Sequence, residues 1–257
     1  MELGLRGKVV AVTGGSEGIG RATVECFVRE GAKVALCARR AEILNAFADQ
    51  LKSAGADVLP MVGDATKPGD MERFIGEVVR RYGRVDVLVN NAGATGQSPF
   101  DAVDDAAWQQ DLDIKVFAHI RTARAVIPHM RKQGGGRIIN LNMIGAKQPA
   151  AGTFPTTISR AAGLALTKAL SKEFAKDNIL VNAVAVGKIK SKQQERRAAR
   201  MKISVEEHYA QTGKTVPLGR MGEAAEVANV IAFLASDAAT YITGCCIQVD
   251  GGMSGVL

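Results

Sequence analysis

The stretch KVVAVTGGSEGIG, residues 8–20, decides the fold. Its apolar first half predicts a buried strand, and its glycines predict a tight turn into a helix that ends near Gly31. Such a turn lets the backbone approach a pyrophosphate, while the helix N-terminus supplies N–H groups and a positive dipole end. The alternative is a turn with a structural role alone. We expect a dinucleotide to contact Gly14, Ser16, Gly18, Ile19 and Gly20.

The rest of the chain repeats this alternation of strand and helix. Further strands are predicted at 33–39, 57–64, 85–93, 136–145, 179–187 and 245–252, and helices at 41–56, 70–83, 108–136, 154–178 and 223–236. Alternation of this kind implies parallel βαβ units with right-handed crossovers. Because no internal boundary or repeat is visible, we predict an α/β fold with a Rossmann-type doubly wound parallel sheet, in one domain covering residues 1–257.

Composition excludes several classes of protein. No apolar run reaches the length of a membrane span, and the N-terminus lacks the pattern of a signal peptide. The four cysteines show no CxxC spacing, so we expect no metal site and reduced thiols in a cytoplasmic protein. The net charge is +7, and residues 188–202, with seven basic residues and one acidic, hold +6 of it. This is a local patch, so we expect no nucleic-acid partner.

The second predicted strand ends in Ala38-Arg39-Arg40. A site for NAD would favour an acidic residue here, which binds the ribose hydroxyls, whereas arginine suits a 2′-phosphate. The sequence therefore favours NADP(H) over NAD(H). The alternative is a pair of solvated arginines.

Four motifs, in order, carry a resemblance to a known family. They are TGGSEGIG at 13–20, Asp64 after the third strand, NNAG at 90–93 and VDGGMS at 249–254. Over nearly its whole length the chain resembles the short-chain dehydrogenases/reductases. The resemblance implies a set of further cofactor contacts: Asp64 and Ala65 at the adenine, Asn90, Ala92, Gly93 and Gly187 along the cofactor, and Ile189 near the nicotinamide.

Enzymes of this family use four catalytic residues, namely Asn, Ser, Tyr and Lys. Aligned on Ser159, these positions fall on Lys115, Met143, Thr156 and Arg160, so all four differ. A threonine hydroxyl is a far weaker acid than a tyrosine phenol, whose pKa is about 10. Met143 cannot donate a hydrogen bond to a carbonyl oxygen, and Arg160 can bind ribose hydroxyls but cannot release a proton.

Several residues are candidates to replace the missing groups. Lys115 is expected near Arg160, and a neighbouring cation lowers the pKa of a lysine toward a useful range. A register slip of one residue puts Asn142 at the Ser position, where it polarises an oxygen; alternatively it bonds local backbone. Thr156 and its neighbour Thr157 orient a substrate or cap the helix, and Tyr209 is a further phenol. His119 and His208 are more simply surface or packing residues.

We therefore expect an NADP(H)-linked oxidoreductase that acts on a carbonyl or hydroxyl substrate through a non-standard site. The basic run falls where the family carries a mobile substrate lid, here about 188–222, so a carboxylate, phosphate or acyl-CoA group is a candidate for recognition. A solvated helix face is the alternative explanation of that run. A lyase or hydrolase on the same fold and a non-catalytic NADP-binding protein remain alternatives.

The resemblance also implies a homo-oligomer, either a dimer or a tetramer. In the family the two long helices, here 107–132 and 155–176, pair across subunits. Small residues in GLALTKAL suit such packing, and we expect no membrane partner.

Overall fold

A seven-stranded sheet forms the centre of the computed structural model, which describes residues 2–94 and 96–256. All neighbouring strands in this sheet are parallel, and their order is β3-β2-β1-β4-β6-β8-β9. The order reverses direction at β1, as in a doubly wound fold. The strands are β1 Val9–Thr13, β2 Lys33–Ala38, β3 Val58–Val62, β4 Val87–Asn90, β6 Gly136–Met143, β8 Ile179–Val186 and β9 Cys246–Val249.

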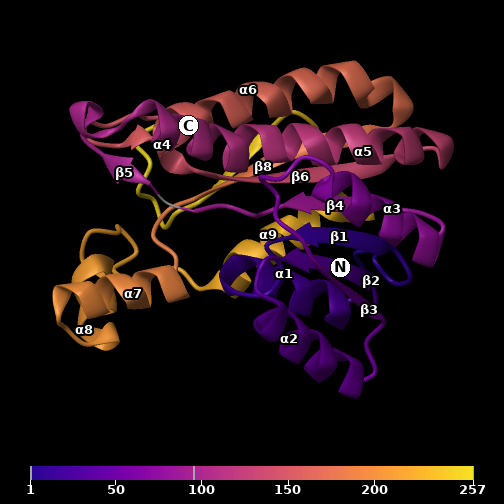
Figure 1. Cartoon of the computed structure of the whole chain (residues 1–257), viewed down its shortest axis with the longest axis horizontal. Coiled ribbons are helices and arrows are strands. Elements are labelled where there is room, and N and C mark those ends of the chain that lie inside the picture. The colour runs from indigo at the N-terminus through magenta and orange to yellow at the C-terminus, as the bar shows by residue number, and fades with distance from the viewer. Residues whose placement is uncertain (1, 95, 257) are drawn as a thin grey trace.

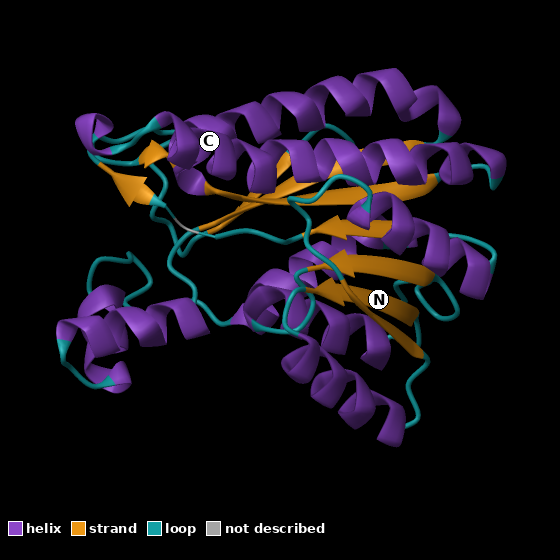
Figure 2. Cartoon of the chain, viewed as in Figure 1, coloured by secondary structure: helices purple, strands orange, loops and turns teal. Residues whose placement is uncertain are grey.

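Helices cover both faces of the sheet (Figures 1 and 2). The first face buries residues of α1, α2 and α9, and the second buries residues of α3, α5 and α6. The prediction of a single Rossmann-type sheet is therefore confirmed. The helices are α1 Gly18–Arg29, α2 Ala41–Ser53, α3 Asp70–Tyr82, α4 Asp105–Leu112, α5 Ala118–Lys132, α6 Thr156–Phe174 and α9 Ala224–Ala235.

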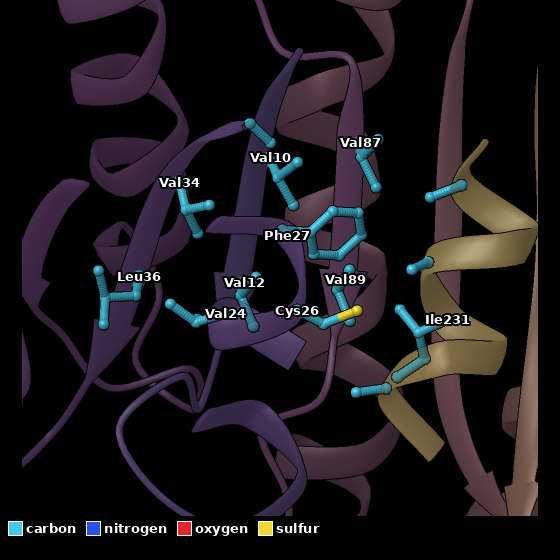
Figure 3. Packing of buried hydrophobic residues seen from close by; sticks show 14 of the residues in the cluster. Val10, Val12, Val24, Cys26, Phe27, Val34, Leu36, Val87, Val89 and Ile231 are labelled. Carbon is cyan, nitrogen blue, oxygen red and sulfur yellow. The ribbon is translucent and has the colours of Figure 1, made fainter. Parts of the chain in front are cut away.

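The core follows from the alternation of side chains along β1. Val10 and Val12 pack on the face that holds Phe27 of α1, whereas Val9 and Ala11 pack on the opposite face. Figure 3 shows Phe27 among valines of β1 and β4. Because both faces are covered, the strand is apolar at every one of these positions, which is why the sequence showed a continuous apolar run.

The chain leaves the sheet after β8 and forms a separate pair of helices, α7 Lys192–Met201 and α8 Val205–Gly213. Figure 1 shows this pair beyond the carboxyl ends of the strands, apart from the helices that cover the sheet. The sequence predicted a polar connection over 188–222, and the connection contains these two helices. Serine side chains start both of them, because Ser191 Oγ accepts from Gln194 N and Ser204 Oγ accepts from Glu207 N.

The predicted helix over 108–136 is interrupted by a wider turn. A π-helical segment, Asp113–Phe117, joins α4 to α5, and the Ala118 N–H donates to the Asp113 carbonyl five residues earlier. Such turns occur often at functional sites. A short antiparallel pair, β5 Gln97–Ser98 and β7 Phe154–Pro155, lies nearby and has too few residues to give a sequence pattern. Within 2–94 and 96–256, no helix combines the length and apolar character that crossing a bilayer requires.

Candidate active site

In the glycine turn after β1, Gly20 packs closely against the chain, whereas Gly18 borders open space. An added Cβ at Gly20 would overlap the Gly14 carbonyl oxygen, so this position needs glycine for the close approach of helix and turn. Gly18 has a φ of +55°, yet an added Cβ there would meet nothing within 4 Å. Asn91 Nδ2 donates to the carbonyl oxygens of Thr13 and Gly14, both at 3.0 Å, and holds the turn against the end of β4.

The N-terminus of α1 can receive an anion. Its N-cap, Glu17, makes no side-chain hydrogen bond to the first turn, because its carboxylate instead pairs with the Arg40 guanidinium. The first-turn N–H groups therefore remain available for a diphosphate. Ser16 is buried beneath the turn, and Ile19 packs against the core. The residues present fit the pyrophosphate of a dinucleotide.

Polar side chains gather at the ends of β2 and β3, where the sequence placed the adenine ribose. Arg39 and Arg40 are both exposed, and Arg40 forms an ion pair with Glu17. Burial raises the pKa of the Asp64 carboxyl, but two hydrogen bonds from Thr66 and the charge of Arg39 bring the pKa below its ordinary value. Thr66 thus fixes the carboxylate, and Ala65 beside it is buried. Arg39 forms no ion pair with any residue that the structure describes.

The segment after β4 lies beside α6. Gly93 has no side chain, and an added Cβ would lie 2.9 Å from Arg160 Nη2, so glycine makes room for that guanidinium. Asn90 is buried, and its amide donates to Asn140 Oδ1 at 2.9 Å and accepts from Thr122 Oγ1 at 2.7 Å. The Asn90 side chain therefore serves an internal network, and the contacts of Asn90, Ala92 and Gly93 with a cofactor stay predictions.

Four polar side chains meet at the junction of α4, the π turn and α6. The buried Lys115 ammonium donates to Asp111 Oδ1 and to Thr156 Oγ1. Thr156 Oγ1 also lies 3.3 Å from the same Asp111 oxygen. Ser159 Oγ donates to the other carboxylate oxygen, Asp111 Oδ2, at 2.5 Å. We call Asp111, Lys115, Thr156 and Ser159 the buried cluster.

The buried cluster lies close to a second cation. Burial is the main cause that lowers the pKa of Lys115 to about 8; the hydrogen bond to Asp111 opposes the shift, and Arg160 adds to it. The sequence predicted a lowered pKa but attributed it to Arg160, which the structure shows to be the lesser cause. Arg160 is partly buried, its Nη1 donates to the Leu141 carbonyl at 2.6 Å, and desolvation lowers its pKa to about 10. It therefore stays charged at neutral pH.

Asn142 is held by backbone on both sides of its amide. Its Nδ2 donates to the Arg160 carbonyl at 2.9 Å, and its Oδ1 accepts from Met143 N at 2.8 Å. This geometry favours the alternative in which Asn142 bonds local backbone. Thr157 Oγ1 donates to Thr153 Oγ1 at 2.7 Å and does not join the buried cluster. Thr156 likewise makes no capping bond, because α6 has Pro155 at its N-cap.

The remaining candidates lie outside the buried cluster. The Tyr209 ring, on α8, faces the Lys190 ammonium at 5.6 Å. His208 bonds Gln194 of α7 at 3.0 Å and is a packing residue. His119 is a buried residue of α5, where burial and the charge of Arg160 lower its pKa to about 3, so it is neutral. Neither of its ring nitrogens has a partner among the described residues.

Asp111 was not predicted from the sequence, and no function was predicted for Ser159. A signal for Asp111 was present, because an acid four residues before Lys115 lies on the same helical face. Nothing in the sequence marked that face as buried.

Two cavities adjoin the segment that follows β8. The larger, about 520 Å³, lies against the ends of β8 and β9 and is bordered by Lys188, Ile189 and Gly222 among others. Ile189 is buried there, and Gly187 packs on Asp250, where an added Cβ would lie 2.8 Å from the Asp250 Cβ. The smaller, about 250 Å³, lies between α7 and α8. The buried cluster lines neither cavity.

Known proteins match this chain over nearly its full length. A family model described as enoyl-(acyl carrier protein) reductase matches residues 14–254. The 3-oxoacyl-[acyl-carrier-protein] reductase of Thermotoga maritima is 35% identical over 250 residues, covering 97% of this chain and 98% of that protein. The human dehydrogenase/reductase SDR family member 4 is 34% identical, covering 96% and 88%. This chain belongs to the short-chain dehydrogenase/reductase family.

Solved structures of short-chain dehydrogenases/reductases agree with the fold in detail. L-sorbose reductase from Gluconobacter frateurii, complexed with NADPH and L-sorbose, matches with a TM-score of 0.97 and 34% identity, each chain covering all of the other. A short-chain oxidoreductase from Pseudomonas aeruginosa PAO1, bound to NADPH and described as containing an atypical catalytic centre, matches with a TM-score of 0.92 and 36% identity, over 97% of this chain and 98% of that one.

Proposed function

We propose that this short-chain dehydrogenase/reductase is an NADP(H)-linked oxidoreductase in which Lys115 handles the proton of a carbonyl or hydroxyl substrate. The observation that carries the proposal is the pair of hydrogen bonds from Lys115 Nζ to Thr156 and Asp111. These bonds place Lys115, whose pKa is lowered, next to Thr156, which we assign to the family's tyrosine position. We also propose that the family's four catalytic positions are occupied here by Lys115, Met143, Thr156 and Arg160.

The residues at the start of α1 and at the end of β2 support NADP(H) as the cofactor. The open space over Gly18 and the uncapped first turn of α1 suit the diphosphate, and the exposed Arg39 suits a 2′-phosphate. Relatives of this fold have been solved with NADPH bound. When bound, NADPH supplies a hydride to the substrate carbon. Arg160, which lies beside Gly93, would hold the ribose and remain protonated throughout.

The proton route uses two side chains. As the carbonyl becomes a hydroxyl, Thr156 Oγ1 gives its proton to the substrate oxygen and takes one from the Lys115 ammonium. Lys115 is left neutral and is reprotonated from solvent before the next turnover. Asp111 holds the ammonium in place through both states, and Ser159 fixes the carboxylate from the other side. In the oxidation direction each transfer is reversed.

The pH dependence follows from the pKa of Lys115. With that pKa at about 8, the ammonium that donates the proton is present at neutral pH and is lost as the pH rises further. We expect the rate of reduction to fall roughly tenfold per pH unit above about pH 8, and the rate of oxidation, which needs the neutral amine, to rise up to about pH 8 and level off above it. The measurement is kcat for NADPH consumption between pH 6 and 10 at constant ionic strength. A profile without an alkaline limb contradicts Lys115 as the donor.

The cofactor preference tests Arg39. We expect Arg39→Ala to raise the Kd for NADPH roughly 10- to 100-fold, the usual range for losing a charge-assisted bond, with little effect on NADH. Arg40→Ala is the matched control, because Arg40 is already paired with Glu17 and should matter less. Cofactor fluorescence titration gives both constants. Equal weakening of NADPH and NADH would show that Arg39 does not contact the 2′-phosphate.

We also propose that the substrate carries an anionic group such as a carboxylate, phosphate or acyl-CoA. The support is the run 188–202, whose net charge is +6, in a lid that forms the α7–α8 pair. The chain is proposed to work in the cytoplasm, in keeping with its four free cysteines. We further propose a homo-oligomer, a dimer or a tetramer, assembled through α5 and α6.

The deciding experiment titrates purified protein with NADPH and NADH and then adds a panel of carbonyl compounds. Tight NADPH binding followed by its oxidation supports the proposal. Binding without oxidation, on neutral and anionic carbonyls alike, favours a non-catalytic NADP-binding protein. Product formed without any change in nicotinamide absorbance favours a lyase or hydrolase on the same fold. Failure to bind either cofactor rules out all of the cofactor-dependent functions.

A further inference from the structure

The smaller cavity, between α7 and α8, is lined by basic and neutral residues. It has a volume of about 250 Å³ and begins beside Lys188, one residue after Gly187 and the end of β8. Two cations line it, and none of its lining residues is acidic. The full lining is Lys188, Gln194, Arg197, Met201, His208, Gln211, Thr212 and Thr215.

Lys188 and Arg197 both line this cavity, and no acidic residue is among its lining residues. Burial lowers the pKa of Lys188, and the charge of Arg197 lowers it further. Glu195 of α7 pairs with Lys192 and lies outside the lining. Glu207 of α8 also lies outside the lining, and its carboxylate accepts from the lining residue Gln211 at 3.0 Å. Two like charges that border one cavity repel each other, and an anion placed between them removes that repulsion.

Neutral donors complete the walls. Gln194 Oε1 lies 3.0 Å from His208 Nε2 and accepts from it, so the amide nitrogen of Gln194 is left to donate. Thr212 adds a hydroxyl, and Met201 adds an apolar surface. A charged pair, neutral donors and an apolar wall together match an oxyanion on a short carbon chain.

We infer that the α7–α8 cavity binds the oxyanion of the substrate, a carboxylate or phosphate, while the carbonyl end lies toward the buried cluster. Lys188 lines both this cavity and the larger one at the ends of β8 and β9, so one residue of the oxyanion site also borders the edge of the sheet. The inference rests on the proposed function, because it assigns the charged end of the same substrate. Lys188 and Arg197 would then bind the anionic group at one site, in place of a general attraction of the substrate to the basic residues of 188–202.

The test uses Arg197→Met and Lys188→Met, with Arg196→Met as the matched control. Arg196 carries the same charge on the same helix but does not line the cavity. The probes are oxo acids of graded length with their methyl esters, and dihydroxyacetone phosphate with dihydroxyacetone. Kinetics give kcat and KM for each pair, and calorimetry gives the Kd of each charged probe without turnover.

We expect Arg197→Met and Lys188→Met to raise KM and Kd for a charged probe roughly tenfold or more, with the neutral partner and kcat unchanged. Arg196→Met should stay within about twofold of wild type. Equal effects of all three variants would reduce the site to general electrostatic attraction and overturn the inference. So would binding of inorganic phosphate at the cavity without binding of any charged carbonyl probe.

The reductase activity and the oxyanion site can be disproved independently of each other. Turnover of neutral carbonyls with no preference for their charged partners keeps the reductase and overturns the oxyanion site. Binding of a charged probe that depends on Arg197, without NADPH oxidation, keeps the oxyanion site and overturns the reductase.

Discussion

Replacing Lys115 by Met is expected to lower kcat for NADPH-dependent reduction by about 10²–10⁴-fold, the usual contribution of a general acid. The reason is that Thr156 cannot regain a proton once the Lys115 ammonium bonded to it is gone. The Kd for NADPH should change little, because Lys115 is buried behind Thr156 and Arg160 remains in place. Stopped-flow measurement of NADPH oxidation separates the two quantities.

Stability must be controlled in this experiment, because Lys115→Met leaves the Asp111 carboxylate buried without its partner. Breaking a buried ion pair costs about 3–5 kcal/mol, whereas replacing both partners by apolar residues is often neutral. The double variant Asp111→Leu/Lys115→Met should therefore fold better than the single variant and remain as inactive. Reduction at the wild-type rate by either variant would remove Lys115 from the mechanism.

The second large effect is expected at Asp111. Changing Asp111 to Asn should lower the free energy of unfolding by about 3 kcal/mol or more, because it leaves the Lys115 ammonium buried without a counter-ion. The same change should lower the pKa of Lys115 further below its value of about 8, since Asp111 is the group that raises it. The alkaline limit of the reduction rate then moves to lower pH. Urea unfolding and a pH–rate profile measure the two effects.

Asp113→Asn provides the matched control for Asp111. Asp113 also bonds a cation, Arg121, at 3.0 Å, but its side chain is partly exposed. An ion pair of this kind is worth about 0–1 kcal/mol, and its loss should leave the pH limit of the rate unchanged. If the two variants behave alike, Asp111 has a structural role only and does not position the proton donor.

The sheet was predictable because its signals are local. Each strand is an apolar run of the right length, and the turn after β1 is marked by its glycines. The α7–α8 pair was not predicted, because α7 is polar around almost its whole surface and buries only Ala198. Without an apolar stripe, a helix of this kind has the composition of a loop.

The candidate site was predictable only in part, for a related reason. Lys115, Thr156 and Arg160 were placed by alignment, and the structure does bring them together. The burial of Asp111 and the bonding of Asn142 depend on how α4 and β6 pack against α6, and single-sequence patterns do not report such packing. Burial is also what sets the pKa of Lys115, so the sequence identified the group without identifying the main cause of its chemistry.

The π turn at Asp113–Phe117 makes this site depend on the number of residues in the helix as well as on their identity. Each residue of an α-helix advances the chain by about 100° around its axis. Loss of one residue from the turn would therefore rotate α4 relative to α5 and carry Asp111 away from Ser159, although no side chain of the cluster had changed. An insertion or deletion in the turn would therefore change the catalytic rate by moving Asp111. A point substitution at an exposed position of the turn, such as Phe117, would mainly change the protein surface.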